Sequence, residues 1–301
     1  ALRRRLASAQ DARIAWDEIP PGVGPFDPQN RLIIGVGPLT DTSAPNSSRT
    51  TLCTLSPQAY PYEWFSYSSI GGSWGPMLKY AGYDTIIIQG QSPEPVYLWI
   101  NDSQVELRDA RDLAGLGTLA TQRRLAQELG GDARIMAIGP AGENLCRIAT
   151  VATSTGSAAG QGGFGAVMGA KSLKAVAVRG TGAIPIAHPE EYSDCTLAIA
   201  REMEAAAGCP RRLMLDPENE ARFGERFVAC SQQCAYRQCL ISRGYAKVPG
   251  VLHPDKEYSG QIACVSSLLC GAPGTAYDWK TGFQAGFELA QISHEYGLNH
   301  W

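Results

Sequence analysis

The amino-acid sequence predicts an α+β protein in which a glycine-rich sheet domain is followed by a mostly helical segment. Up to about residue 185, short apolar runs rich in β-branched residues alternate with Gly, Pro, Asn and Asp, a pattern typical of strands. After about His188 the apolar residues follow the period of amphipathic helices. We therefore expect two parts, residues 1–187 and residues 188–301.

The expected elements follow one another along the chain. An amphipathic helix opens it at 1–16, and a second helix at 119–131 places Leu125 four residues before Leu129 and ends at Gly130. Beyond the boundary, helices are expected at 189–208 and 279–299. The strand-like runs are 31–36, 83–90, 95–102, 104–109, 133–139, 146–153 and 173–180.

Composition excludes several classes of protein. The chain has 301 residues, 44% hydrophobic residues and a net charge of −3, which describes a globular protein without the basic surface that nucleic acids require. No apolar run is long enough to span a membrane, and no signal peptide is visible. Nine cysteines without a secretory signal favour a reducing cytoplasm and metal ligation over disulfides.

Two glycine-rich segments echo each other. Gly71–Met77 (GGSWGPM) precedes the strand-like TIIIQG, and Gly162–Met168 (GGFGAVM) precedes KAVAVRG. The echo suggests two related loops on a pseudo-symmetric sheet domain, which could hold two similar ligands. Chance similarity within a glycine-rich chain is the alternative.

The second segment, GQGGFGAVMGAK (160–171), resembles a nucleotide-binding loop but fails each test for one. No Asp or Glu occurs between Gly160 and Pro189, the spacing to Lys171 is wrong for a P-loop, and the other kinase motifs are absent. Glycine backbone N–H groups can still approach an anion closely, with Lys171 and Lys174 supplying charge. A structural glycine turn is the alternative.

Three cysteines lie close together at Cys230, Cys234 and Cys239. Thiolates in a C-x3-C-x4-C pattern favour an iron–sulfur cluster, with Cys264, Cys270 or a residue beyond the chain as fourth ligand. Structural zinc and unligated thiols remain alternatives. His253, Glu257 and Cys264 follow, and they could act as acid/base groups or metal ligands; a surface loop leading into a packed helix is the alternative.

These segments together resemble the tungsten-containing aldehyde:ferredoxin oxidoreductase family. The matching stretches are NRLIIGVGPLTDT, GGSWGPMLKYAGYDTIIIQGQSPEPVYLWI, IGPAGEN and GGFGAVMGAKSLKAVAVRGT, and the similarity runs from about Trp16 to Glu191. The resemblance implies a first domain of two pseudo-symmetric sheets. It also implies tungsten or molybdenum held by two pyranopterins whose phosphates are bridged by Mg²⁺, together with a [4Fe–4S] cluster.

The resemblance assigns roles to residues of this chain. It places the cluster on Cys230, Cys234 and Cys239, although each gap is one residue longer than in the family, and a pterin contact at His294–Asn299. Gln161 stands where the family has a basic residue. The cofactor-binding residues that it implies are Arg49, Gly71, Gly72, Trp74, Gly75, Lys79, Gly162, Gly163, Gly165, Ala166, Met168 and Lys171.

The resemblance implies a tungstopterin iron–sulfur oxidoreductase that converts aldehydes to carboxylic acids. Electrons would pass to ferredoxin or an iron–sulfur partner subunit, within a homo- or hetero-oligomer. Glu257 or His253 would be the acid/base, with Cys264 as a possible metal ligand. The alternatives are an aromatic acyl-CoA reductase subunit of the class II benzoyl-CoA reductase branch, where Cys264 would bind tungsten, and a non-catalytic cofactor-binding paralogue.

Overall fold

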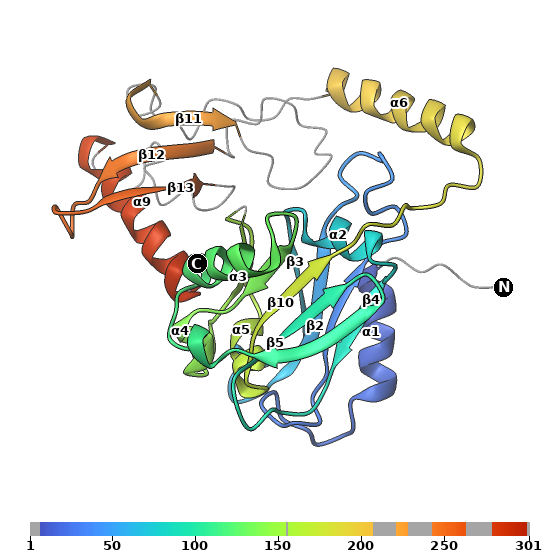
Figure 1. Cartoon of the computed structure of the whole chain (residues 1–301), viewed down its shortest axis with the longest axis horizontal. Helices are drawn as coiled ribbons and strands as arrows, with labels where there is room; N and C mark the ends of the chain where they lie inside the picture. Colours follow the sequence, from blue (N-terminus) through green and yellow to red (C-terminus); the bar gives the residue numbers. More distant parts are fainter. Residues whose placement is uncertain (1–6, 155, 207–220, 228–242, 263–278, 300–301) are drawn as a thin grey trace.

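The computed structural model describes residues 7–154, 156–206, 221–227, 243–262 and 279–299. The described chain is α+β, as the sequence predicts (Figure 1). One antiparallel sheet has the strand order β3-β2-β1-β4. Its strands are β1 (Leu32–Val36), β2 (Thr50–Ser56), β3 (Trp64–Ile70) and β4 (Thr85–Ile88).

The second sheet has the order β6-β5-β10-β7-β8-β9. Its strands are β5 (Val96–Asn101), β6 (Gln104–Asp109), β7 (Arg134–Ala137), β8 (Val151–Thr153), β9 (Ala158–Ala159) and β10 (Leu173–Arg179). A three-stranded antiparallel sheet, β11-β12-β13, follows in the C-terminal part and was not predicted. It consists of β11 (Gly224–Phe227), β12 (Arg243–Pro249) and β13 (Glu257–Ile262).

The four helices that the sequence predicts lie close to their predicted positions, whereas the short helices at 74–80, 140–143 and 164–170 were not predicted. The opening helix α1 is observed from residue 7, and α6 begins one residue after the predicted boundary near His188. The division into domains itself stays a prediction. The described helices are α1 (Ala7–Glu18), α2 (Trp74–Tyr80), α3 (Thr118–Leu129), α4 (Pro140–Glu143), α5 (Phe164–Ala170), α6 (Pro189–Ala206) and α9 (Trp279–Tyr296), with a 3₁₀ turn η1 (Arg111–Leu113).

The sheet domain is an internal duplication. The first half runs β1-β2-β3-α2-β4 and the second runs β7-β8-β9-α5-β10. The strand order β3-β2-β1-β4 recurs as β9-β8-β7-β10, and every neighbouring pair within both sets is antiparallel. The predicted pseudo-symmetry is thus confirmed, and strands β5 and β6 extend the second half beyond the repeat.

The two halves share one hydrophobic core between their sheets. Leu32, Leu52 and Ile70 from the first sheet pack in the same cluster as Met136 and Val176 from the second. Because strands at such an interface are buried along their length, β1 and β10 read as continuous apolar runs. Helix α1 covers the other side of the first sheet, and α3 packs on the second.

Strands β2 and β3 were missed because their sequences are rich in Ser and Thr. One buried hydroxyl group of β2 is held by a neighbouring segment, since Asn30 Nδ2 donates to Thr54 Oγ1 at 3.0 Å. Strand β8 is shorter than the predicted run 146–153 because the residues before it pair with the end of the chain. Ala149 forms a bridge with Leu298, and Thr150 N donates to Gly297 O at 2.8 Å.

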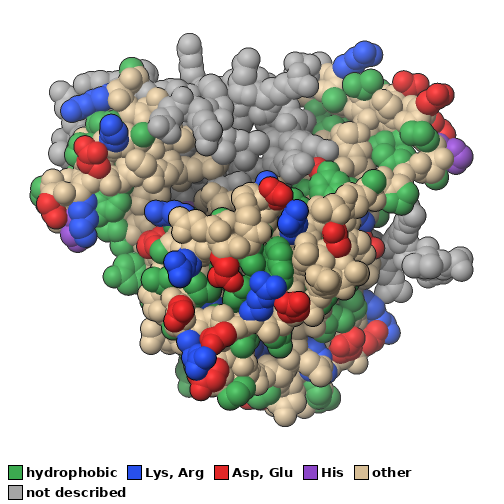
Figure 2. Space-filling model, in the orientation of Figure 1, with side chains coloured by type: hydrophobic (Ala, Val, Ile, Leu, Met, Phe, Trp, Pro, Cys, Tyr) green, Lys and Arg blue, Asp and Glu red, His purple; other side chains and the backbone are tan. Residues whose placement is uncertain are grey.

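The surface mixes both signs of charge. On the face shown in Figure 2, Lys and Arg side chains are interspersed with Asp and Glu side chains over the sheet domain. Among the described residues, no helix is long and apolar enough to cross a membrane.

Helix α5 packs so closely on α4 that a glycine is required. A Cβ atom on Gly169 would overlap the backbone carbonyl of Gly142. We expect Gly169→Ala to lower the free energy of unfolding by about 1–3 kcal/mol or more, because the backbone cannot move away without disturbing the core. Urea unfolding measures the effect. Gly131→Ala is the control, since a Cβ there meets nothing within 4 Å, and an equal cost for both variants would contradict the explanation.

Asp11 of α1 is a buried carboxyl group that lies against the backbone of Gly35. Burial raises its pKa from 3.8 to about 7, against a smaller lowering by the Thr85 side chain. Between pH values of about 4 and 7, Asp11 therefore stays protonated in the folded protein but is ionised in the unfolded chain. We expect the free energy of unfolding to fall as pH rises from about 4 to 7, by at most about 4 kcal/mol.

Asp11→Asn should remove that fall in stability, as followed by urea unfolding at several pH values. Asp17→Asn is the matched control, because Asp17 lies on the same helix but is exposed and pairs with Arg13. A pH profile unchanged by Asp11→Asn would show that Asp11 is not the titrating group.

Candidate cofactor site

The two glycine segments lie at equivalent places in the two halves. Each follows an edge strand, β3 or β9, and leads into a seven-residue helix, α2 or α5. Gly72 has a φ of +93°, while Gly162 and Gly163 have φ of +103° and +65°. Other residues rarely adopt these left-handed conformations, so glycine is needed in both loops for the chain to turn from strand into helix.

Hydroxyl groups connect each loop to the opposite half. Ser56, at the end of β2, donates to the carbonyl oxygen of Gly162 at 2.9 Å. Thr153, at the end of the equivalent strand β8, lies 3.5 Å from the carbonyl oxygen of Gly71. The Gln58 side chain also accepts from Gly162 N. The two loops are therefore held side by side across the pseudo-symmetry axis.

An aromatic–glycine pair begins both helices. Trp74 and Phe164 are fully buried, and Trp74 Nε1 donates to the carbonyl oxygen of Val176 at 3.0 Å, across to the other half. A Cβ atom on Gly75 would lie 2.5 Å from Thr50 Oγ1, and one on Gly165 would lie 2.5 Å from the Thr150 carbonyl oxygen. The structure thus aligns Trp74-Gly75 with Phe164-Gly165, one residue out of the register that the sequence echo suggested.

The glycines of the second loop are also required by packing within the protein. A Cβ atom on Gly163 would overlap the carbonyl of Arg147 and approach Pro57 to 2.8 Å. Ala166 and Met168, also predicted to bind cofactor, are fully buried in the shared core. Much of the segment therefore packs against the rest of the protein, as expected for a structural glycine turn. Only the backbone of the loop remains as the part that can face a ligand.

The basic residues differ in what they can offer an anion. Arg49 is exposed beside the first loop, where its Nη2 donates to the carbonyl oxygen of Ser69 at 3.1 Å. Lys79 is ion-paired with Asp84. Lys171 is buried, and its Nζ donates to the carbonyl of Asn30 at 2.7 Å.

Burial lowers the pKa of both lysines that follow the second loop. Together with the charge of Arg31, it lowers the pKa of Lys171 to about 8. Burial also lowers the pKa of Lys174, whose Nζ donates to the Leu116 carbonyl at 2.7 Å and pairs with Glu143. Both ammonium groups serve the interior of the fold, so Arg49 is the predicted cofactor residue whose charge is most available.

A second pair of equivalent turns escaped the sequence analysis. Gly37-Pro38 follows β1, and Gly139-Pro140 follows β7, the equivalent strand of the other half. A search for repeated Gly-Pro after apolar runs would have found this signal. In the first half the turn leads to Asp41, whose carboxylate accepts from Tyr80 of α2 and raises the pKa of Tyr80 to about 12.

The segment His294–Asn299 returns to the second loop, as its predicted role requires. Asn299 is buried, its N donates to the carbonyl oxygen of Ile148 at 3.0 Å, and its Oδ1 lies 3.5 Å from the Cβ position of Gly160. Direct contact with a pterin stays a prediction.

The predicted acid/base residues lie elsewhere. His253 lies in the turn between β12 and β13, and Glu257 is the first residue of β13; Figure 1 shows these strands apart from α2 and β3. His253 Nδ1 lies 2.8 Å from Oε1 of the buried Glu288. Burial alone would raise the pKa of Glu288, but hydrogen bonds from Leu252 N, the His253 side chain and Val251 N lower it to about 2. This contact anchors the turn, and a catalytic role for either residue stays a prediction.

The predicted metal ligands cannot be placed. Cys230, Cys234, Cys239 and Cys264 lie outside the described residues. Within the described ranges, no three His, Cys, Asp or Glu side chains are grouped to hold a metal ion.

The duplicated sheets and the paired glycine loops define a pseudo-symmetric sheet domain. A family model, the N-terminal domain of aldehyde ferredoxin oxidoreductase, matches residues 7–180. This chain therefore belongs to the aldehyde ferredoxin oxidoreductase family.

Several relatives match over the sheet domain. The tungsten-containing aldehyde ferredoxin oxidoreductases of Pyrococcus furiosus and Thermococcus kodakarensis are 43% and 44% identical over 176 residues, which is 58% of this chain and 29% of each relative. The aliphatic sulfonate oxidoreductase WOR-like subunit of Pyrococcus furiosus is 36% identical over 182 residues, or 56% of this chain and 28% of that protein. The chain thus covers less than a third of the length of these relatives.

A solved structure matches nearly the whole chain. It is described as the active site complex BamBC of benzoyl coenzyme A reductase in complex with 1,5-dienoyl-CoA. The TM-score is 0.83 at 31% identity, and the match covers 97% of this chain and 49% of that chain. The C-terminal elements therefore share the fold too, beyond the range of the family model.

If the hydroxyl contacts between the two halves position the glycine loops, removing one contact should change the loop in the opposite half. We expect Ser56→Ala to cost about 1–3 kcal/mol of unfolding free energy, because the Gly162 carbonyl loses a buried partner. The amide resonances of the Gly162 loop should shift in ¹⁵N NMR spectra. Ser66→Ala on β3 is the control, since its hydroxyl makes no hydrogen bond within the described part of the chain. Unchanged Gly162 resonances in Ser56→Ala would refute the link.

Proposed function

We propose that this chain is the cofactor-binding part of a tungstopterin oxidoreductase that acts on aldehydes. Family membership supports a redox enzyme, and the relatives from Pyrococcus and Thermococcus are tungsten-containing aldehyde ferredoxin oxidoreductases. Electrons would pass through an iron–sulfur cluster on Cys230, Cys234 and Cys239 to ferredoxin or an iron–sulfur subunit, in the cytoplasm.

The observation that carries the proposal is the pair of equivalent loops. Gly71-Gly72 and Gly162-Gly163 close the two halves at neighbouring edge strands and are joined by reciprocal hydroxyl contacts. A site with internal two-fold pseudo-symmetry suits two copies of one ligand better than a single asymmetric nucleotide. This supports a bis-pterin cofactor.

The residues of the two loops are placed so that they could bind a bis-pterin cofactor. The loop backbones at Gly71, Gly72, Gly162 and Gly163 would line it, and the exposed guanidinium of Arg49 would pair with a phosphate. Lys79 and Lys171 would act indirectly, by fixing α2 and the second loop from within. When bound, the cofactor would supply two-electron redox chemistry at its metal, and Mg²⁺ would offset the negative charge of its phosphates.

A second candidate is an aromatic acyl-CoA reductase subunit. It is favoured by the structural match to the benzoyl coenzyme A reductase complex, which extends over 97% of the chain and includes the C-terminal elements. That neighbour is a complex, which supports a hetero-oligomeric partner for this chain. Aldehyde oxidation with a viologen dye and reduction of an aromatic acyl-CoA distinguish the two candidates.

The experiment is metal and pterin analysis of anaerobically purified protein. We expect tungsten or molybdenum with two pterins for each metal, and Arg49→Gln should retain less than half of both, because a charge-assisted phosphate contact is lost. Arg13→Gln is the control, since Arg13 pairs with Asp17 on the surface of α1. Absence of both metals and of pterin from the unaltered protein would contradict the proposal.

A further inference from the structure

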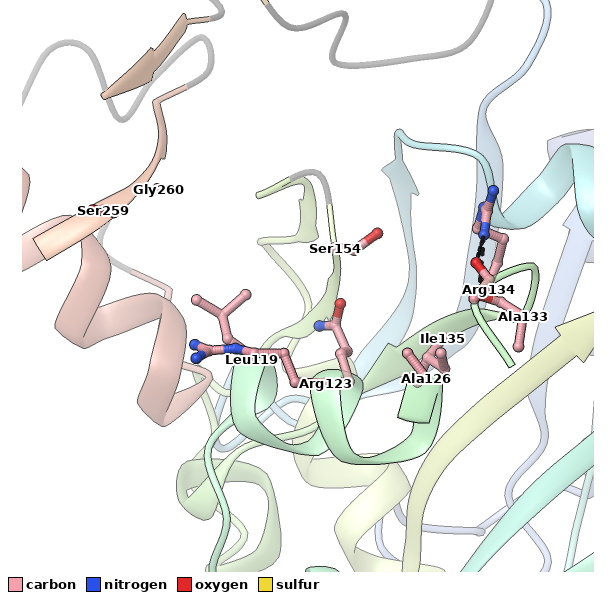
Figure 3. A pocket seen from close by; sticks show the side chains of 11 residues that line it. Leu119, Arg123, Ala126, Ala133, Arg134, Ile135, Ser154, Ser259 and Gly260 are labelled. Atoms are coloured by element: carbon pink, nitrogen blue, oxygen red, sulfur yellow. Dashed lines mark hydrogen bonds between the residues drawn. The ribbon is translucent and has the colours of Figure 1, made fainter. Parts of the chain in front are cut away.

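A cavity of about 490 Å³ lies beside helix α3, away from the glycine loops. Its walls come from α3, from the start of β7 and from β13, so it lies where the sheet domain meets the C-terminal sheet (Figures 1 and 3). None of the residues that line it belongs to either glycine loop. Its apolar wall consists of Leu119, Ala126, Ala133 and Ile135.

One polar group in the wall lacks a partner. Gln122 is only 4% exposed, and its Nε2 donates to the carbonyl oxygen of Ala152 at 3.2 Å. Because that carbonyl can only accept, the amide orientation is fixed and Oε1 is the free acceptor. Oε1 is buried and has no hydrogen-bond partner among the described residues, which is costly unless a donor reaches it. A ligand that fits the cavity should therefore carry an O–H or N–H group.

The cavity also carries unbalanced positive charge. Among the residues that the structure describes, Arg123 and Arg134 line it and no acidic side chain does. Arg134 is used locally, where its Nη1 donates to the carbonyls of Gly131 and Asp132. Arg123 makes no ion pair with any residue in the described ranges, and Figure 3 shows it projecting from α3 on the same side as Leu119. It is therefore the group that would meet an anion.

A neighbouring cavity of about 530 Å³ shares Leu119, Arg123 and Ser259 with the first. The side chains of Glu257 and Glu295 line this second cavity, so it lacks the uniform positive charge of the first. The two meet at Arg123, and the first is the better site for an anion.

We propose that the cavity beside α3 binds a small organic carboxylate with an apolar body and a hydroxyl or amide donor. The carboxylate pairs with Arg123, the apolar body lies against Leu119, Ala126 and Ile135, and the donor satisfies Gln122 Oε1. Ser154 and Ser259 add hydroxyl groups at the rim. The site is independent of the cofactor proposed above, since no loop residue takes part.

The test uses 4-hydroxyphenylacetate as the probe, titrated into the 301-residue chain by calorimetry and NMR. Two relatives of the probe each lack one group: 4-methylphenylacetate lacks the donor, and 4-hydroxyphenethyl alcohol lacks the carboxylate. We expect the probe to bind roughly tenfold or more tightly than either relative, because one relative lacks the donor to Gln122 Oε1 and the other lacks the carboxylate that pairs with Arg123. Backbone resonances of Leu119, Gln122 and Ser154 should shift.

Two variants assign the contacts. Arg123→Gln should weaken binding of the probe roughly tenfold or more and leave 4-hydroxyphenethyl alcohol unaffected. Arg124→Gln is the matched control, since Arg124 is exposed on the same helix but lines neither cavity. Gln122→Met should abolish the preference for the hydroxylated probe over its methyl relative.

The proposal is overturned if no probe binds at millimolar concentration, or if Arg123→Gln and Arg124→Gln change the affinity equally. Should Gln122→Met fail to fold, the comparison of the hydroxylated and methylated probes on the unaltered chain still tests the donor contact. Equal affinity for those two probes would overturn that part of the proposal.

Discussion

The sheet domain depends on the close approach of two short helices to the strands of its two halves. Gly75 lets α2 lie on Thr50, and Gly165 lets α5 lie on the backbone at Thr150. With the helices this close, Trp74 reaches the carbonyl oxygen of Val176 in the other half, and a single core fills the space between the sheets. Any larger residue at the two glycines would separate a helix from its sheet and open that core.

The C-terminal part is tied to this domain by backbone and charge as well as by apolar contacts. The carboxylate of Glu295 accepts from Leu119 N and Ala120 N at 3.2 Å, at the start of α3, where backbone N–H groups lack partners within the helix. Thr118 Oγ1 donates to the His294 carbonyl at 2.7 Å. The end of α9 therefore caps α3, and the following residues pair with the segment before β8.

The sequence predicted those features that depend on local patterns. The apolar strands β1 and β10, the amphipathic helices α3, α6 and α9, and the repeat of the glycine loops all show a clear period or motif. Strand β2 has too few apolar residues to reveal it, and its burial follows from its position between β1 and β3. Strand β3 is an edge strand whose side chains are mostly exposed or half-buried, and serines interrupt its apolar residues. The roles of Lys171 and Lys174 were equally hidden, because only the fold shows that Lys171 donates to backbone carbonyls and that Lys174 donates to the Leu116 carbonyl and pairs with Glu143.

Pseudo-symmetry constrains the proposed cofactor site more than any single residue does. Each half supplies a turn after its first strand, a glycine loop after its third and a hydroxyl group directed at the other half. The charges are not duplicated, since Arg49 is exposed on one side while Gln161 occupies the second loop. Two chemically identical ligands would therefore meet the same backbone but different charges, and this difference would make the two binding positions unequal.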